Sequence, residues 1–97
     1  MNKIANLLKI AVKAKAIVIG EELVLKGIRN KSIKVVILAN DAGPNTTKRI
    51  TDKSSFYEIP LITSLNSDDF EYILGKPGRK VIGVIDKGFA ESILKNI

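Results

Sequence analysis

Residues 34–48 read Lys-Val-Val-Ile-Leu-Ala-Asn-Asp-Ala-Gly-Pro-Asn-Thr-Thr-Lys, and this stretch decides the fold. Its aliphatic run, Val35–Leu38, has no polar alternation, which is typical of a strand covered on both faces. Turn-forming residues follow, and Pro44 cannot donate to a strand ladder while Asn45 can cap a helix. Because a strand buried on both faces needs helices on both sides, the stretch predicts a layered α/β protein.

The rest of the chain supplies those helices and three more strands. Apolar spacing predicts helices over residues 2–15, 21–30, 46–57, 68–74 and 88–94, and strands over residues 17–19, 35–38, 61–63 and 81–85. Ser67 and Asp86 are the predicted N-caps of the last two helices. The alternation predicts one domain over residues 1–97, a three-layer α/β/α sandwich with a small mixed four-stranded sheet.

Composition narrows the function classes. The 97 residues contain no Cys and no His, which excludes thiolate metal sites and removes the commonest general base and zinc ligand. The absence of Cys fits a reducing cytosol. The sequence has no apolar run of the roughly 18–20 residues that span a membrane, and its first helix is too interrupted by Lys for a signal peptide. We therefore expect a soluble cytoplasmic protein with no membrane partner and no cofactor.

The positive charge is concentrated in the first half of the chain. The net charge is +6, and residues 1–50 hold ten Lys or Arg against three acids, whereas residues 51–97 hold six against seven. A basic half indicates an anionic partner, with nucleic acid ahead of a membrane surface. A Lys-rich surface that only confers solubility is the alternative.

Catalysis has weak support in the sequence. Asp41 and Asp86 both follow predicted strands, where open α/β sheets place their sites, and such a pair can chelate magnesium or carry a phosphoryl group. Asp41 is equally explained by a turn, and Asp86 by a helix cap. The sequence contains no nucleophile elbow, no Gly-x-Gly-x-x-Gly and no Walker motif, so we expect no enzyme and no catalytic or metal-binding residue.

Two other segments are candidates for anion binding. A strand that passes through Gly20 into a helix leaves unpaired N–H groups at the helix start, which can bind phosphates or base edges, with Lys26 about one turn further along. The spacing alone favours the alternative, in which Glu21 and Glu22 only complement the helix dipole. The second segment is the Gly/Pro loop over residues 75–80, which carries three basic residues. All five aromatic residues fall at predicted helical positions, so we expect no stacking surface, and recognition through RNA shape and a few base edges.

At this level of detail the whole chain resembles the L7Ae/L30e superfamily of ribosomal proteins, most closely its small bacterial YlxQ-like members. The resemblance covers nearly all of the chain and rests on short matches in the same order: Leu7–Ala11, Gly20–Val24, Lys34–Asp41, Asn45–Thr46, Thr51–Lys53, Ile59–Pro60, Leu74–Lys76 and Asp86–Ala90. It implies an RNA-binding α/β/α sandwich whose usual target is the kink-turn, a sharply bent helix–internal loop–helix. It also implies that the start of the second helix enters the RNA groove, while the loop before the last strand covers a flipped-out nucleotide. The resemblance therefore favours the RNA interpretation of the Gly20 segment.

Two positions depart from the pattern Gly-x-Asn-Glu-x-x-Lys of kink-turn binders. Gly20 and Lys26 fit, but Glu22 stands where Asn is usual and Leu23 where Glu is usual. Ionised Glu22 only accepts hydrogen bonds, so it suits a guanine edge or a cytosine amine and repels phosphate. The expected target is thus a kink-turn-like or related bent RNA.

The expected partner is a ribosomal or other stable non-coding RNA, and the ribosome is one place where the protein could act. We expect the protein to bind as a monomer. A protein–protein adaptor on the same fold is the alternative. Lys13 and Lys15 are expected to add phosphate contacts. The candidate RNA-binding residues are Gly20, Glu21, Glu22, Lys26, Arg29, Asn40, Lys76, Pro77, Gly78, Arg79 and Lys80.

Overall fold

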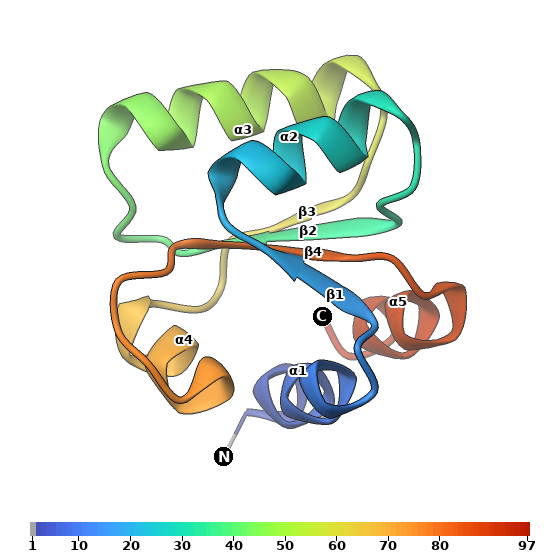
Figure 1. Ribbon diagram of the computed structural model, residues 1–97, viewed down its shortest axis with the longest axis vertical. Coiled ribbons are helices and arrows are strands. Elements are labelled where there is room, and N and C mark those ends of the chain that lie inside the picture. Colours follow the sequence, from blue (N-terminus) through green and yellow to red (C-terminus); the bar gives the residue numbers. More distant parts are fainter. Residues whose placement is uncertain (1) are drawn as a thin grey trace.

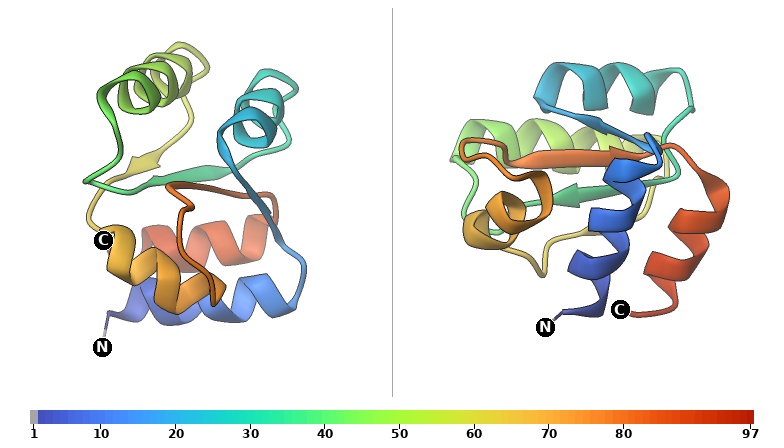
Figure 2. Two further views of the ribbon diagram at one scale, coloured as in Figure 1. Left: turned by 60° about the vertical axis from the view of Figure 1, so that its left-hand side comes forward. Right: turned by 60° about the horizontal axis from the view of Figure 1, so that its bottom comes forward.

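A computed structural model describes residues 2–97 and shows a mixed sheet between two layers of helices (Figure 1). The elements follow one another as α1 (Lys3–Lys13), β1 (Ile17–Ile19), α2 (Glu21–Arg29), β2 (Val35–Leu38), α3 (Pro44–Phe56), β3 (Leu61–Ile62), α4 (Ser67–Leu74), β4 (Val81–Val84) and α5 (Lys87–Leu94). Helices α2 and α3 cover one face of the sheet, and α1, α4 and α5 cover the other (Figure 2). The predicted three-layer sandwich with a four-stranded mixed sheet is confirmed.

Strand β2 has the central role that its aliphatic run predicts. All four of its residues are buried. Val35 and Ile37 pack with the core beneath α1, α4 and α5, whereas Val36 and Leu38 pack with the core beneath α2 and α3. Successive strand residues point to opposite faces, so an apolar run without alternation supplies both cores at once.

The strand directions determine which loops meet. The strand order is β1-β4-β2-β3, and β4 runs antiparallel to both β1 and β2, while β2 and β3 are parallel. Leu38 pairs with Val81 and Ile19 with Ile82, so the ends of β1 and β2 lie beside the start of β4. We call this end of the sheet, where β1 and β2 finish and β4 starts, the Val81 edge. Asp41 follows β2 at this edge, but Asp86 follows the antiparallel β4 at the opposite edge, so the two aspartates do not meet as the enzyme alternative would require.

The start of α3 differs from the prediction. Asn45 was the expected cap, yet the N-cap is Gly43, and Pro44 occupies the first helical position. Proline suits that position because an N–H group there would have no intrahelical partner, so nothing is lost by its absence. Asp86 does cap α5 as predicted, since its carboxylate accepts a hydrogen bond from the N–H of Phe89 at 2.8 Å.

The start of α4 also lies one residue from its predicted place. Ser67 is the first helical residue, and Asn66 is the N-cap. The Asn66 side chain accepts from the N–H of Asp69 at 2.9 Å, and the Asp69 carboxylate accepts from the N–H of Asn66 at 3.0 Å. This reciprocal pair is a capping box, which satisfies two N–H groups where a lone serine cap satisfies one.

Ile33 fixes the position of α2 on the sheet. It is 1% exposed and lies before β2, against two glycines from separate elements. A Cβ built on Gly27 of α2 or on Gly83 of β4 would lie 2.5 Å from Cδ1 of Ile33 in either case. The two glycines therefore leave the space that the Ile33 side chain occupies.

Candidate nucleic-acid interface

Helix α2 begins at the Val81 edge with its first N–H groups uncapped. Its N-cap, Gly20, has φ +103° and ψ 151°, a conformation that L side chains rarely adopt, and no side chain of residues 2–97 caps the helix. The N–H of Gly20 itself donates to the carbonyl of Val81 at 3.0 Å. The first intrahelical bond runs from the N–H of Val24 to the carbonyl of Gly20. The N–H groups of residues 21–23 thus remain available to an anion at the positive end of the helix dipole.

The basic loop over residues 75–80 lies beside this helix start. Gly75 ends α4 in the left-handed region at φ +76°, and Gly78 has φ +89°. The loop leads directly into Val81, whose carbonyl holds Gly20, so the two segments predicted from the sequence are neighbours (Figure 1). Lys76, Pro77, Gly78 and Arg79 are exposed, and neither basic side chain forms a salt bridge within residues 2–97.

Lys80, the last residue of the loop, is tied to the protein itself. Its ammonium group donates to the hydroxyl of Ser67, and that hydroxyl donates to the carboxylate of Asp41 at 2.7 Å. The N–H of Ser67 also donates to Asp41, at 3.0 Å. The Ser67 hydroxyl is the main cause that lowers the pKa of Asp41, helped by the Ser67 N–H and by the charge of Lys80. Lys80 therefore anchors the loop to the start of α4 and positions it.

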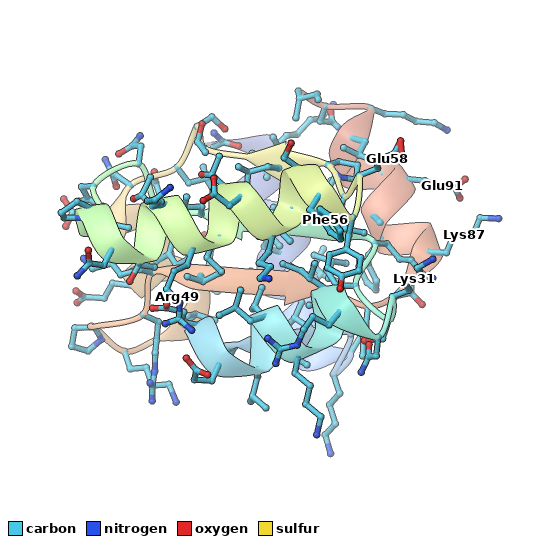
Figure 3. All side chains as sticks on the ribbon, turned by 90° about the horizontal axis from the view of Figure 1, so that it is seen from above. Lys31, Arg49, Phe56, Glu58, Lys87 and Glu91 are labelled. Atoms are coloured by element: carbon cyan, nitrogen blue, oxygen red, sulfur yellow. The ribbon has the colours of Figure 1, made fainter. Side chains whose placement is uncertain are left out.

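Glu21 and Glu22 are held by α3, which sequence reasoning did not foresee. The guanidinium group of Arg49 donates to Glu21 at 2.5 Å and to Glu22 at 3.1 Å, and the hydroxyl of Thr46 donates to Glu21 at 2.7 Å. We call this arrangement the Arg49 clamp (Figure 3). One cation thus offsets two carboxylates beside the uncapped N–H groups. Arg49 lies 27 residues or more from its partners along the chain, and no local pattern signals the pairing.

The remaining candidates divide between the two ends of the sheet. Asn40 is exposed at the Val81 edge, directly after Ala39, whose N–H donates to the carbonyl of Lys80 at 2.8 Å. Lys26 and Arg29 are exposed further along α2. Lys13 and Lys15 precede β1, whose first residue pairs with Val84, so they lie at the end of the sheet away from Gly20. The structure therefore does not bring these two lysines to the candidate interface.

One aromatic residue also differs from the expectation. The helical positions of the aromatics predicted that none would be free for stacking, but Phe56, the last residue of α3, is 77% exposed. It meets the ring of Tyr57 edge to face at 5.0 Å between centroids. A large exposed aromatic is therefore present on the same layer of helices as Gly20.

Other kinds of site receive no support from the described part of the chain. Residues 2–97 contain no group of three or more Asp, Glu, His or Cys placed to hold a metal ion. No helix among those residues has the length and apolarity that crossing a membrane requires. The hollow beside α4, about 430 Å³, is lined by Asp68, Glu71, Tyr72 and Gly75, and its acids make it unfavourable for a phosphate.

Comparisons with known proteins show the family of the chain. Residues 2–94 match the sequence profile of the ribosomal protein L7Ae/L30e/S12e/Gadd45 family. The chain is 44% identical over 89 residues to a protein of Enterococcus faecium named RNA-binding protein YlxQ, an alignment that covers 92% of this chain and 85% of that one. It is 40% identical over 88 residues to the protein of the same name from Bacillus subtilis, covering 91% and 88% of the two chains.

Solved structures show the same fold. A protein of unknown function from Bacillus halodurans superposes with a TM-score of 0.92 at 37% identity, covering 98% of this chain and 96% of that one. A Giardia lamblia protein described as a 15.5kD RNA binding protein superposes with a TM-score of 0.82 at 18% identity, covering 94% of this chain and 81% of that one.

Proposed function

The chain belongs to the ribosomal protein L7Ae/L30e/S12e/Gadd45 family, and we propose that it binds structured RNA at the Val81 edge of its sheet. The observation that carries the proposal is the hydrogen bond from the N–H of Gly20 to the carbonyl of Val81, because it joins an uncapped helix start to a basic loop. Relatives named as RNA-binding proteins support the same class of ligand. The proposed role is non-catalytic, as a monomer in the cytoplasm, on ribosomal or other stable non-coding RNA.

Each part of the edge has a distinct task in this proposal. The N–H groups at the start of α2 donate hydrogen bonds to a phosphate or a base edge, while Lys76 and Arg79 neutralise the backbone of the bent strand. Asn40 adds a side chain that both donates and accepts. Lys26 extends the cationic surface along α2. Recognition depends on a sharp bend, because only a bent RNA presents two closely spaced backbone segments to a helix start and a loop at once.

Glu22 determines how the target differs from a standard kink-turn. Its side chain is 78% exposed and its carboxylate accepts hydrogen bonds only, so we propose that it accepts hydrogen bonds from a guanine Watson–Crick edge or a cytosine amine. Arg49 donates to one oxygen of this carboxylate, Oε2, so the other oxygen remains available to the base while the ion pair stays in place. The proposed target is a bent RNA in which a guanine or cytosine edge meets the start of α2.

The adaptor alternative has less support. It requires Glu21 and Glu22 to face a basic partner surface, but Arg49 already pairs with both, and the side chain of Glu21 is only 23% exposed. A partner protein would have to displace an existing ion pair. An adaptor remains distinguishable by experiment, since it would stay bound to another protein after nuclease treatment.

A binding assay over a range of salt concentrations tests the proposal. Fluorescence anisotropy with a labelled kink-turn, a related bent RNA and an unbent duplex should give tighter binding to a bent RNA than to the duplex. Affinity should fall steeply with salt, with a log–log slope of about −0.9 for each phosphate neutralised. Lys26→Ala combined with Arg79→Ala should weaken binding and make the slope shallower by about 2. Equal affinity for bent RNA and duplex would contradict the proposal.

A further inference from the structure

A groove between α2 and α3 continues from the Arg49 clamp. It has a volume of about 340 Å³ and is lined by Leu25, Arg29, Arg49, Asp52, Lys53 and Phe56. The four residues from α3 are spaced at i, i+3, i+4 and i+7, which places them on one face of the helix. Both helices start at the Val81 edge, so the groove runs away from that edge along the outer surface (Figure 3).

The two ends of the groove differ in chemistry. Arg49 and its two acids lie near the helix starts, whereas Phe56 lies about 10 Å further along α3, given a rise of roughly 1.5 Å per residue over seven residues. The charges of the groove lining are predominantly positive. Asp52 is paired with Lys48 at 3.0 Å, and Arg49 is paired with Glu21 and Glu22 of α2. Arg29 and Lys53 are therefore the cations of the groove that form no salt bridge among residues 2–97.

The combination favours a nucleotide over a protein segment. A specific protein interface buries roughly 800 Å² per partner around an apolar centre, but the exposed apolar surface of this lining is confined to Phe56, because Leu25 at the groove floor is 2% exposed. One exposed aromatic ring with neighbouring cations is enough for a single-stranded nucleotide, whose base stacks and whose phosphates pair. The volume lies in the range of sites that hold small ligands, about 300–1,000 Å³.

We propose that the α2–α3 groove is a second RNA contact, which holds a single-stranded nucleotide flanking the bent RNA, with its base stacked on Phe56 and its phosphates on Arg29 and Lys53. The inference rests on the proposed function, since the strand would enter the groove from the Val81 edge. A strand that leaves the start of α2 passes Arg49 first and then reaches Phe56, and the one acid of the groove lining, Asp52, is paired with Lys48.

Binding assays with two forms of one RNA test this site. The same bent RNA is prepared with a blunt end and with a short single-stranded tail, at the 5′ end in one version and at the 3′ end in another. Wild-type protein should bind one tailed form more tightly than the blunt form. Phe56→Ala should remove that gain, about 5- to 150-fold, and leave the affinity for the blunt form unchanged. Lys53→Ala should make the salt slope shallower by about 1 for the tailed form only.

Matched variants separate stacking from general effects. Phe56→Leu keeps an apolar side chain without a π face and should behave as Phe56→Ala does, whereas Phe56→Tyr should retain the gain. Tyr72→Ala removes a 40% exposed aromatic that Lys9 covers at 4.1 Å in the opposite layer, and it should have no effect on either RNA. The thermal unfolding temperature of each variant is measured to check that the fold is intact.

The outcomes distinguish this site from the proposed function. If wild-type protein binds bent RNA but tails add nothing, or Phe56→Ala retains the gain, the groove proposal is wrong and the proposed function stands. If no bent RNA binds, the proposed function fails. Oligouridylate is then titrated alone by NMR, and shifts at Arg29, Lys53 and Phe56 support the groove whereas unchanged signals overturn it. A partner protein could instead co-purify with the nuclease-treated wild type and be lost from Phe56→Ala, while RNA binding is the same in both. That result would overturn the nucleotide proposal and assign the groove to a protein partner.

Discussion

Replacing Arg49 with alanine tests how the two acids at the start of α2 coexist with RNA binding. In the structure one guanidinium group bridges Glu21 and Glu22, beside the N–H groups proposed to bind RNA. Arg49→Ala leaves both carboxylates without a cation at that point. We expect a loss of RNA affinity that is larger than the loss of one positive charge alone would produce, because two negative charges become uncompensated at the same time.

The magnitude follows from Coulomb's law. A carboxylate about 6 Å from a phosphate repels it by about 0.7 kcal/mol in bulk water and by about 3 kcal/mol at an effective dielectric constant near 20. The Glu22 carboxylate is 78% exposed, and salt at physiological strength screens charges beyond about 8 Å, so the lower figure applies to Glu22. Glu21 is only 23% exposed and contributes more. A sum of about 1.5–2 kcal/mol corresponds to a roughly 10- to 30-fold weaker affinity.

Unfolding should change far less than binding. Exposed ion pairs typically stabilise a fold by about 0.2–1 kcal/mol, and the dipole of α2 favours acids at its start even without Arg49. Urea denaturation of Arg49→Ala should therefore give a free energy of unfolding within about 1 kcal/mol of the wild-type value. A loss of RNA affinity in this variant then reports on the interface and not on the fold.

Fluorescence anisotropy with a labelled bent RNA measures the effect, and Lys48→Ala is the matched control. Lys48 precedes Arg49 on α3 and carries the same charge, but it pairs with Asp52 and not with the acids of α2. Its removal should weaken binding by no more than about threefold, since its charge acts from outside the clamp. Adding Glu21→Gln to Arg49→Ala should recover much of the lost affinity, and Glu22 is kept because it is proposed to contact a base. Equal losses in the two single variants, or no recovery in the double variant, would refute the reasoning.

Three further predictions concern the fold. Gly83→Ala should destabilise by about 1–3 kcal/mol in urea denaturation, because its Cβ would lie 2.5 Å from Cδ1 of Ile33. Gly43→Ala, with φ −63° and open space around the new Cβ, should be close to neutral, and a similar cost in both would contradict the steric argument. Ser54→Ala should stabilise by about 1 kcal/mol, because its hydroxyl is buried without a hydrogen-bond partner in the described structure; a loss of stability would indicate a partner. Asp41→Asn should lower the free energy of unfolding at neutral pH. Since folding lowers the pKa of Asp41 below its ordinary value of 3.8, this stabilisation is present above that value and is lost as the pH falls through the folded-state pKa. Urea denaturation at neutral and acidic pH should show the difference from wild type shrinking in acid, and a constant difference would count against it.

Much of the fold was predictable because its signals are local. The run Val35–Leu38 gave the bounds of β2 without error, since four consecutive aliphatic residues after a polar turn suit only a fully buried strand here. Helix starts were harder. Asn66 and Ser67 are both good N-cap residues, and only the acid three positions after Asn66 distinguishes the two, because it completes a capping box.

The candidate site was predictable only where a residue acts through its own segment. Glycine and charge spacing identified the Gly20 start and the 75–80 loop as candidates, but for the Gly20 start only the family resemblance favoured RNA binding over a role limited to the helix dipole. Arg49 and Phe56 depend instead on which face of α3 turns towards α2, a tertiary relation that no short stretch encodes. The direction of β4 is equally non-local. Alternating strands and helices did not reveal that β4 is antiparallel, and this direction separates Asp86 from Asp41.

The packing of Ile33 against Gly27 and Gly83 links the evolutionary freedom of three positions that are far apart in the chain. Each glycine alone is intolerant of a methyl group, but a shorter side chain at position 33 would release room for one. Natural variation at these sites should therefore be correlated, with a larger residue at 27 or 83 accompanied by a smaller one at 33. A designer who wished to stiffen α2 with alanine at position 27 would have to shorten Ile33 beyond valine, because Cγ1 of Ile33 would itself lie 2.7 Å from the new Cβ.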